Sequence, residues 1–322
     1  MLTNLTASSP SQVIRNIQQR AANRRAGTSI DDNRKIALVI EGGGMRAVYS
    51  AAGATALAQL GYSGLFDEVY ATSAGVMNAS YFIANQALLG MSVYFENCAT
   101  RNFFNPARFW KVIDVDYIVD KVAAVEKRLD VDAVKRSVTR LLVAACDYRT
   151  GAPLLIDTQT TETPIWEVFR AAMAIPVFYN RTVQVDGRAC VDCGTILPFP
   201  LTDAINRGCT DILVLLTRPS SFEERSPPLG MKLTFNVVHS RFKRTLSHAF
   251  AHRRESAQRV RELALGRIAP PPGVNIMAAF PDESDAVQST TTQQDIVYPA
   301  ALRYGKKVLE LFGHDPDILV LR

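Results

Sequence analysis

The sequence has 322 residues, of which 48% are hydrophobic and 21% charged, and its formal net charge is +5. These values are ordinary for a soluble globular protein. No apolar run approaches the ~18 residues of a membrane span and no apolar signal-peptide core follows the start, so we expect a cytoplasmic protein.

The first part of the chain is polar and basic. Residues 1–30 contain four arginines and no acidic residue, and their pattern predicts a short helix from about Ser11 to Arg24. We interpret residues 1–34 as a basic N-terminal arm that docks on the protein surface. A transit peptide, which this stretch weakly resembles, is the alternative.

Strand and helix patterns alternate from Lys35 onward. Short aliphatic runs predict strands at 36–40 and 68–71, and a helical pattern follows each of them, at about 45–60 and 75–89. This order is typical of an α/β fold in which right-handed crossovers build a mostly parallel sheet.

The remaining elements continue this α/β pattern. Two strands around an Arg-Thr-Gly turn, a hairpin with Asp186-Gly187 at its turn and a core strand in "TDILVLL" extend the sheet. Helices are predicted at 164–175 and in "PLTDAINRG". After these come a Pro-containing loop, a basic helical segment, a strand and a closing helix, at 220–230, 239–268, 274–278 and 294–312.

Three consecutive glycines, Gly42 to Gly44, lie between the first predicted strand and the first predicted helix. Glycine loses more backbone entropy than any other residue and packs no side chain, so this loop indicates a close approach to an anionic group. The loop fits the dinucleotide fingerprint G-x-G-x-x-G/A, but the candidate ribose acids, Asp67 and Glu68, lie at the wrong end of the second strand. The Gly-Lys-Ser/Thr of a Walker loop is absent. The loop therefore indicates binding of an oxyanion.

Ser73, in "EVYATSAGVMNAS", stands at the next strand-to-helix turn. A serine with small residues two positions away, here Ala71 and Gly75, is the pattern of a nucleophile elbow, although a helix N-cap has the same pattern. Because neighbouring parallel strands end at the same rim of a sheet, we expect Ser73 to lie beside the glycine loop. A serine hydroxyl next to backbone N–H groups has the layout for acyl transfer.

A serine nucleophile needs a base within hydrogen-bond reach. The four histidines, His239, His248, His252 and His314, all lie in the last third of the chain and leave a Ser-Asp-His order open. Asp192, in "CVDCGTILPFP", is the sharper candidate because it ends the predicted hairpin and precedes a glycine and a proline-bounded turn. An ordinary turn aspartate is the alternative.

Together the three motifs resemble those of the patatin-like phospholipase family, which combines a G-G-G-x-R-G loop, a G-x-S-x-G elbow and a D-G-G/A motif. Here they are "GGGMRA", "ATSAG" and "DCG", and the similarity extends over about 35–219. Ala47, Ala71 and Cys193 stand where the family pattern has glycine.

This resemblance implies a patatin-like three-layer α/β/α sandwich and a lipid acyl hydrolase of the phospholipase A or lysophospholipase type, which cleaves carboxylic esters. Ser73 takes the position of the nucleophile and Asp192 that of the general base. The loop of Gly42, Gly43 and Gly44 takes the position of the oxyanion hole, with Gly43 and Gly44 as the expected donors. Burial is expected to raise the pKa of the aspartate base, whereas the positive end of a helix would lower it.

Two features near these motifs have more than one interpretation. Arg46 either orients the glycine loop or forms an ordinary surface salt bridge. The large apolar residues around the elbow either line an acyl channel or belong to the core; they are Met77, Phe82, Leu88, Phe103, Phe104, Phe109 and Trp110.

The expected partner is phospholipid or another acyl-ester lipid, and neither a metal or other cofactor nor a nucleic-acid partner is expected. Cys190 and Cys193 form a lone C-x-x-C without further ligands nearby, so buried small side chains are favoured over a metal or redox site. Two rivals stay open. One is a catalytically weak lipid-binding or effector module, and the other is a Ser-Asp-His esterase that uses a late histidine.

Three segments are distinguished within one domain: the arm 1–34, a catalytic core 35–220 and a C-terminal part 221–322. The segment 239–268 in the last of these contains eight Lys or Arg residues and two Glu. It either contacts an anionic membrane peripherally or forms a solvated helix face.

Overall fold

The computed structural model describes most of the chain, namely residues 11–28, 33–105, 107–108, 111–176, 178–179, 181–224, 244–285 and 287–321. Of Thr195 and residues 244–253 it describes the backbone alone.

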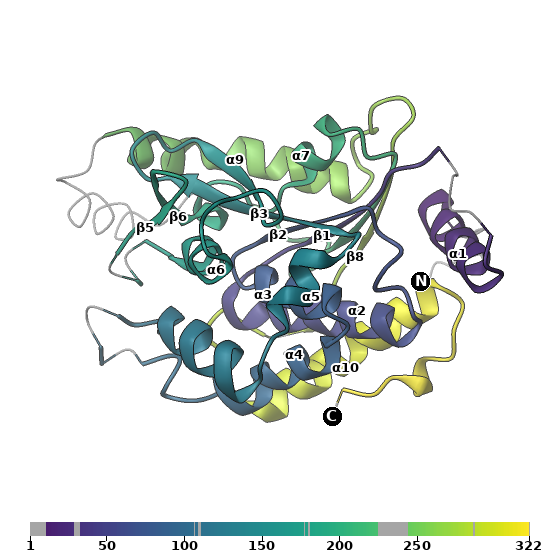
Figure 1. Ribbon diagram of the computed structural model, residues 1–322, viewed down its shortest axis with the longest axis horizontal. Helices are drawn as coiled ribbons and strands as arrows, with labels where there is room; N and C mark the ends of the chain where they lie inside the picture. Colours follow the sequence, from purple (N-terminus) through teal and green to yellow (C-terminus); the bar gives the residue numbers. More distant parts are fainter. Residues whose placement is uncertain are drawn as a thin grey trace.

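The described chain forms a three-layer α/β/α sandwich around one central, mostly parallel sheet, as the sequence predicts (Figure 1). In sheet order the strands are β5 (Val183–Val185), β6 (Arg188–Asp192), β3 (Arg140–Asp147), β2 (Glu68–Thr72), β1 (Ile36–Ile40), β7 (Asp211–Leu215) and β8 (Asn275–Ala279). From β3 to β8 neighbouring strands are parallel, whereas β6 and β5 are antiparallel to their neighbours. A further strand, β4 (Pro153–Asp157), pairs antiparallel with β3.

Helices cover both faces of the sheet (Figure 1). One face carries α7 (Leu201–Asn206) and α9 (Arg244–Ala264). The other carries α2 (Val48–Gln59), α3 (Gly75–Ile83), α4 (Ala87–Val93), α5 (Val131–Arg136), α6 (Ile165–Met173) and α10 (Gln294–Leu311).

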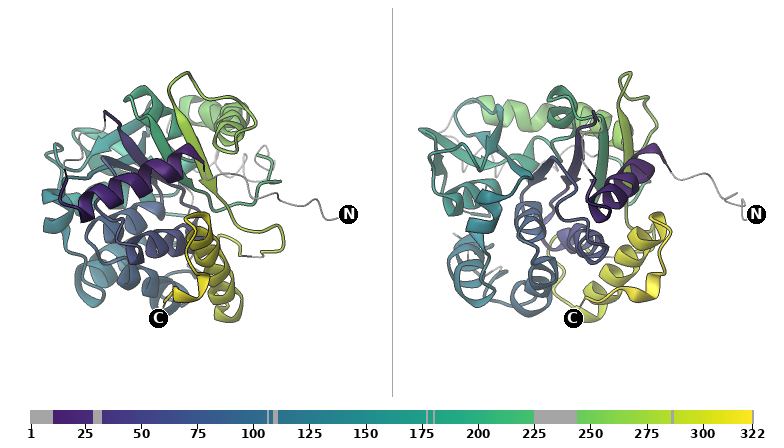
Figure 2. Two further views of the ribbon diagram at one scale, coloured as in Figure 1. Left: turned by 90° about the vertical axis from the view of Figure 1, so that its right-hand side faces the viewer. Right: turned by 45° about the vertical axis from the view of Figure 1, so that its right-hand side comes forward.

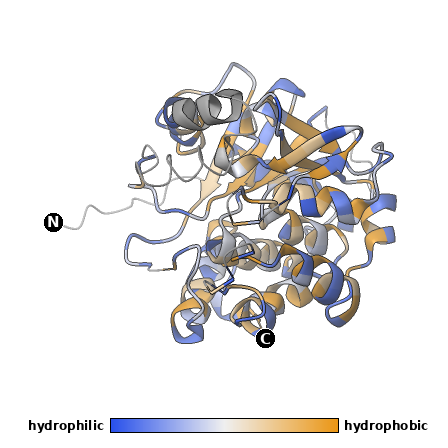
Figure 3. Ribbon diagram, turned by 90° about the vertical axis from the view of Figure 1, so that its left-hand side faces the viewer, coloured by the Kyte–Doolittle hydropathy of each residue, from blue (hydrophilic) through white to orange (hydrophobic). Residues whose placement is uncertain are grey.

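The core follows from strands that are apolar on both sides. Along β1, Ala37 and Val39 join the apolar cluster beneath α7 and α9, while Ile36, Leu38 and Ile40 join the larger cluster on the opposite face. Figure 3 shows the hydrophobic residues concentrated on the strands and on the helices beside them. A parallel sheet covered on both faces requires such continuous aliphatic runs, which is why they were readable in the sequence.

Two predicted helices differ from the observed ones. The helix predicted at 75–89 is two helices, because Asn85 adopts a left-handed backbone (φ +58°) between the end of α3 and the start of α4. The helix predicted at 45–60 begins with one 3-10 turn, Gly44–Ala47, before α2. Between α4 and β3 the chain forms two π-helical segments, Tyr94–Cys98 and Tyr117–Glu126, as well as α5.

Helix α1 (Gln12–Arg25) packs beside β7 and β8 (Figure 2). Arg20 in this helix is almost fully buried and forms an ion pair with Asp67, with a 2.7 Å distance between its Nη1 and the carboxylate oxygen. Two elements that follow residue 220 belong to the same fold. Strand β8 pairs with β7 in the central sheet, and helix α10 packs on α2. The segment boundaries at 34 and 220 stay a prediction.

Candidate active site

Ser73 occupies the turn between β2 and α3 with a strained backbone. Its φ is +50°, a left-handed value that a non-glycine residue adopts at a cost of about 1–3 kcal/mol. Its residue is only 8% exposed. A buried serine held in a strained strand-to-helix turn has the geometry of a nucleophile elbow, as the sequence pattern predicts.

The glycines around this turn are required by close contacts. A Cβ atom added to Gly42 would lie 2.5 Å from the carbonyl oxygen of Thr72 and 2.7 Å from the Cβ of Ser73. A Cβ added to Gly75 would lie 2.8 Å from the carbonyl oxygen of Ile40. The glycine loop and the elbow therefore touch through their backbones.

Sheet register explains why Asp192 meets Ser73. Strand β2 pairs with the first part of β3, and its last residue, Thr72, lies opposite Ala144. Strand β6 approaches from the opposite direction, and its last residue, Asp192, lies opposite Ala145. Because Ala144 and Ala145 are adjacent, the ends of β2 and β6 meet on β3, and the residue after β2 is Ser73.

The Asp192 carboxylate is buried and accepts hydrogen bonds. It accepts one from the N–H of Gly194 at 2.7 Å. Ser73 lies beside it, since a Cβ added to Gly194 would be 3.0 Å from Oδ1 of Asp192 and 3.9 Å from the Cβ of Ser73. Burial raises the pKa of Asp192 to about 6, although the Ser73 hydroxyl and the Gly194 amide act to lower it. The upward direction agrees with the expectation from the sequence.

The glycine loop has unused backbone donors. Gly43 and Gly44 adopt positive φ values of +139° and +61°, conformations that favour glycine. The next two amides in the chain are occupied, since Met45 donates to the carbonyl of Ser289 at 3.1 Å and Arg46 to that of Gly43 at 3.3 Å. Within the described part of the chain, the amides of Gly42, Gly43 and Gly44 have no hydrogen-bond acceptor.

Arg46 lies beside the loop rather than in a surface salt bridge. Burial lowers the pKa of its guanidinium, while the nearby charge of Glu41 raises it and that of Arg261 lowers it. No carboxylate among the described residues lies within ion-pair distance of Arg46, and its Nε is buried without a hydrogen-bond partner there. Its role in orienting the loop stays a prediction.

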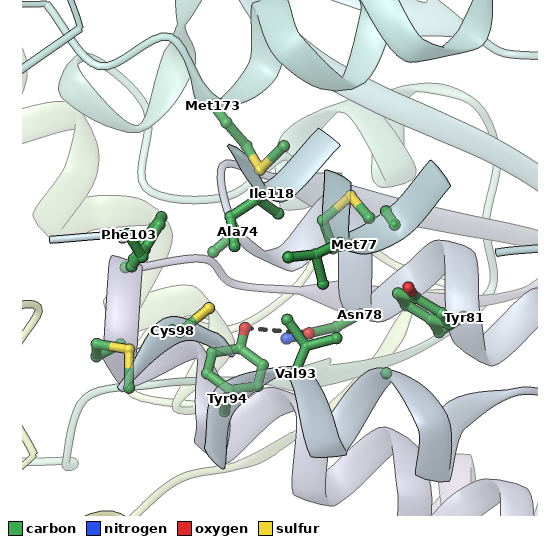
Figure 4. Close-up of a pocket in the computed structure, with 15 residues that line it drawn as sticks. Ala74, Met77, Asn78, Tyr81, Val93, Tyr94, Cys98, Phe103, Ile118 and Met173 are labelled. Atoms are coloured by element: carbon green, nitrogen blue, oxygen red, sulfur yellow. Dashed lines mark hydrogen bonds between the residues drawn. The ribbon is translucent and has the colours of Figure 1, made fainter. Parts of the chain in front are cut away.

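An apolar cavity adjoins the loop and the elbow, and Figure 4 shows side chains that line it. Gly44 and Ala74 line its near end, and Met77 and Tyr81 extend it along α3. Tyr81 is seven residues after Ala74, so at a helical rise of 1.5 Å per residue the two are separated by about 10 Å along the helix axis. Tyr94 and Asn78 in the cavity wall bond to each other, since the Tyr94 hydroxyl donates a hydrogen bond to the side-chain oxygen of Asn78 at 3.1 Å.

The seven large apolar residues singled out in the sequence have different fates. Met77 and Phe103 line the cavity, Phe82 is fully buried core, and Leu88 is 40% exposed. Phe104 forms an isolated antiparallel bridge with Ile113. The remaining two, Phe109 and Trp110, lie outside the described residues.

Of the four histidines, the structure describes the side chain of His314 alone. His314 is exposed just after α10. His239 lies outside the described residues, as do the side chains of His248 and His252. The Ser73 hydroxyl is itself one of the groups that act on the Asp192 carboxylate and lower its pKa.

The C-x-x-C cysteines are separated by the sheet. Cys190 packs in the large core cluster and Cys193 in a small cluster with Cys146 and Tyr148. All five cysteines of the chain are buried free thiols, and burial raises the pKa of Cys190 to about 11. Among the described residues, no group of three or more His, Cys, Asp or Glu side chains is placed to hold a metal ion.

The α/β/α sandwich and the contact between the glycine loop and the Ser73 turn place the chain in a structural class: α/β proteins with a nucleophile elbow beside a glycine loop. The chain belongs to the patatin-like phospholipase family: the family model matches residues 38–205, which include the glycine loop, Ser73 and Asp192. Members of this family are lipid acyl hydrolases. This confirms the resemblance that the three motifs indicate.

Two individual proteins show similarity to the chain. It is 32% identical over 192 residues to the uncharacterized protein YjjU of Escherichia coli (strain K12), an alignment that covers 58% of this chain and 53% of YjjU. The chain thus spans about half the length of this curated relative. A comparison with the crystal structure of VipD from Legionella pneumophila gives a TM-score of 0.44 at 12% identity, covering 87% of this chain and 66% of VipD.

Proposed function

We propose that this protein hydrolyses the carboxylic esters of acyl lipids, as a phospholipase A or lysophospholipase, through a Ser73–Asp192 dyad. One observation carries the proposal: a serine in a left-handed, strained turn lies beside a buried carboxylate, that of Asp192. The unused amides of Gly42 to Gly44 and the apolar cavity beside them support it.

In the proposed acylation, the Ser73 oxygen attacks the ester carbonyl while its proton passes to Asp192. Amides of the glycine loop, with Gly43 and Gly44 as the expected donors, hold the oxyanion of the tetrahedral intermediate. When the intermediate collapses, the carbon–oxygen bond to the alcohol breaks and the leaving oxygen takes the proton from Asp192. The acyl group stays on Ser73, with its chain directed into the cavity.

Deacylation reverses these roles with water. Asp192 accepts a proton from a water molecule, whose oxygen attacks the acyl-serine carbonyl. The ester bond to Ser73 then breaks and Ser73 recovers its proton from Asp192. Because a pKa of about 6 leaves Asp192 ionised at neutral pH yet a stronger base than an ordinary carboxylate, burial suits it to both steps.

The three residues that replace glycine in the family motifs pack in the interior of the protein. Ala47 and Ala71 are fully buried in the large core cluster, and Cys193 is fully buried in its own small cluster. Their side chains are thus accommodated by packing away from solvent. We therefore favour an active enzyme over a catalytically weak lipid-binding or effector module.

For the segment 239–268 we propose peripheral contact with anionic membranes, in an enzyme located in the cytoplasm. Residues 239–243 lie outside the described part, as do the side chains of 244–253. In the described remainder of α9, Arg254 and Arg259 are exposed. No helix in the described part of the chain is long and apolar enough to cross a membrane.

Covalent labelling with a fluorophosphonate probe tests the proposed nucleophile. The purified wild-type protein is expected to be labelled at Ser73, and Ser73→Ala to remain unlabelled. Labelling should be slowed strongly by Asp192→Asn but little by His→Ala changes at 239, 248, 252 and 314. An unlabelled wild type would contradict the proposal, and a histidine variant as slow as Asp192→Asn while folded would favour the Ser-Asp-His esterase. A panel of defined phospholipid, lysophospholipid, glycolipid and neutral-lipid esters then identifies the substrate.

A further inference from the structure

Thr217 lies on the opposite side of the glycine loop from Ser73. It follows β7 by two residues, is 1% exposed, and donates a hydrogen bond from its hydroxyl to the carbonyl oxygen of Gly42 at 2.7 Å. This threonine lies outside the three motifs and outside the residues that the family model matches.

This hydrogen bond sets the direction of a neighbouring N–H group. In a planar trans peptide the carbonyl oxygen of Gly42 and the amide hydrogen of Gly43 point to opposite sides of the chain. Strand β1, which leads into the loop, lies between β7 and β2. Since the Gly42 carbonyl is drawn toward Thr217 at the end of β7, the Gly43 N–H is directed toward the end of β2, where Ser73 lies.

We propose that Thr217 is a positioning residue, which holds the Gly42–Gly43 peptide so that the Gly43 N–H faces the oxyanion formed at Ser73. The loop has few other anchors for this peptide. Gly42 and Gly43 have no side chains to fix them, and within the described residues their amides have no acceptor. A Cβ on Gly43 would lie 3.2 Å from the Thr217 hydroxyl oxygen, so a side chain at this position would crowd the threonine.

A buried ion pair holds Thr217 in turn. The Glu41 carboxylate accepts a hydrogen bond from the backbone N–H of Thr217 at 2.6 Å through one oxygen. Its other oxygen accepts one from Nη2 of Arg261 in α9, at 2.7 Å. The side chains of Glu41 and Arg261 are 5% and 0% exposed. Both faces of the loop are therefore fixed from within the protein, one by the elbow and the other by β7 and α9.

The inference rests on the proposed ester hydrolysis, and Thr217→Val tests it by removing only the hydroxyl from a side chain of similar shape. With a short soluble ester, kcat is expected to fall roughly 10- to 100-fold with KM nearly unchanged, because a misdirected donor costs less than the ~10²–10³ of a lost one. Thr217→Ser keeps the hydroxyl and is expected to restore most of kcat. Thr217→Ala serves the same purpose as Thr217→Val if the valine variant does not fold.

Thr139→Val is the matched control. The Thr139 hydroxyl is equally buried and donates to the backbone carbonyl of Phe66 at 2.6 Å, at the opposite rim of the sheet. This variant is expected to lose stability as Thr217→Val does, but to keep its kcat. A merely structural role for Thr217 would make the two variants alike.

The outcomes separate this inference from the proposed function. If the wild type is labelled at Ser73 and Thr217→Val keeps the wild-type kcat, or if Thr217→Ser is as impaired as Thr217→Val, the positioning role is wrong while the dyad stands. If the wild type neither hydrolyses esters nor reacts at Ser73, both are wrong. A selective loss of kcat in Thr217→Val that Thr217→Ser reverses supports both.

Discussion

Two buried carboxylates at opposite ends of β2 have pKa values shifted in opposite directions. Glu68 begins the strand, and Asp192 lies beside the serine that follows it; each is 2% exposed. Burial raises the pKa of Glu68, but hydrogen bonds from Arg207, Tyr70 and Lys35 outweigh it and lower that pKa to about 2. For Asp192, burial prevails and the pKa rises to about 6.

The difference lies in the partners. Arg207 and Lys35 form ion pairs with Glu68 at 2.8 and 3.0 Å. The groups that act to lower the pKa of Asp192 are neutral ones, the Ser73 hydroxyl and the backbone amide of Gly194. The ionised form of Glu68 thus stabilises the fold, whereas the ionised form of Asp192 costs free energy that the rest of the fold must supply. Carboxylates with pKa values raised by burial cluster at functional sites, and this is why we propose Asp192 as the base.

The largest effect is expected from a substitution of Asp192 itself. Asp192→Asn removes the base and should reduce ester hydrolysis at least ~100-fold, the scale of general-base catalysis. The penalty of the ionised carboxylate on the folded state grows as the pH rises above the ordinary aspartate pKa and is complete above about 6. The same change is therefore expected to raise the free energy of unfolding at neutral pH, by up to about 3 kcal/mol. Enzyme kinetics and denaturant unfolding measure the two effects.

Glu68→Gln is the matched variant at the other end of the strand. It removes a charge that stabilises the fold, so the free energy of unfolding should fall by about 1–3 kcal/mol, while the folded enzyme keeps its kcat. Two outcomes would contradict the contrast between a stabilising Glu68 charge and a destabilising Asp192 charge. One is a loss of activity in Glu68→Gln like that of Asp192→Asn, and the other is a loss of stability in Asp192→Asn like that of Glu68→Gln.

The sequence predicted the parts of this site that depend on local pattern. The continuous aliphatic strands and the Gly-Gly-Gly, Ala-x-Ser-x-Gly and Asp-Cys-Gly motifs indicated the sheet, the elbow and the loop, because each is short and has one physical explanation. The meeting of Asp192 with Ser73 was expected from the family resemblance. Its physical cause, the pairing of β2 and β6 with adjacent residues of β3, is a long-range register that no local pattern contains.

Other features were missed for the same reason. Thr217 lies in the otherwise unremarkable "LLTRP", and its proposed role depends on which strand β7 pairs with. The cavity is built by segments from five parts of the chain, including the π-helical stretch Tyr117–Glu126, whose irregular spacing hides the helical period. Asn85, which divides the helix predicted at 75–89, lies within a mostly apolar helical pattern and gave only a weak signal.

A pH profile sharpens the comparison with a smaller effect. Asp192 must be ionised to accept a proton, so kcat/KM should rise with pH through an apparent pKa of about 6 and be about tenfold lower at pH 5 than on its plateau. Glu68 has a lowered pKa, so its contribution to stability is present above the ordinary glutamate pKa and is lost only as the pH falls toward about 2. Activity should therefore fall reversibly between pH 7 and 5 in a protein that stays folded.

Steady-state kinetics and near-ultraviolet circular dichroism over the same pH range provide the check. The residual activity of Asp192→Asn should lack the inflection near 6. An unchanged inflection in that variant would assign it to another group, and unfolding that coincides with the loss of activity would remove the distinction between the two carboxylates.

The smallest expected effect extends the comparison to α9, where Arg261 and Arg259 lie two positions apart. Arg261 is fully buried and paired with Glu41, whereas Arg259 is exposed. If 239–268 contacts an anionic membrane, Arg259→Gln should weaken binding to vesicles that contain anionic lipid by about 1 kcal/mol, or about fivefold, and leave hydrolysis of a soluble ester unchanged. Glu255→Gln, one turn earlier and also exposed, removes a negative charge and should strengthen that binding instead. Co-sedimentation at low salt measures both changes, which should shrink as salt shortens the Debye length. Because only the charge facing the membrane differs, equal binding of both variants and the wild type to anionic vesicles would assign this face of α9 to solvent.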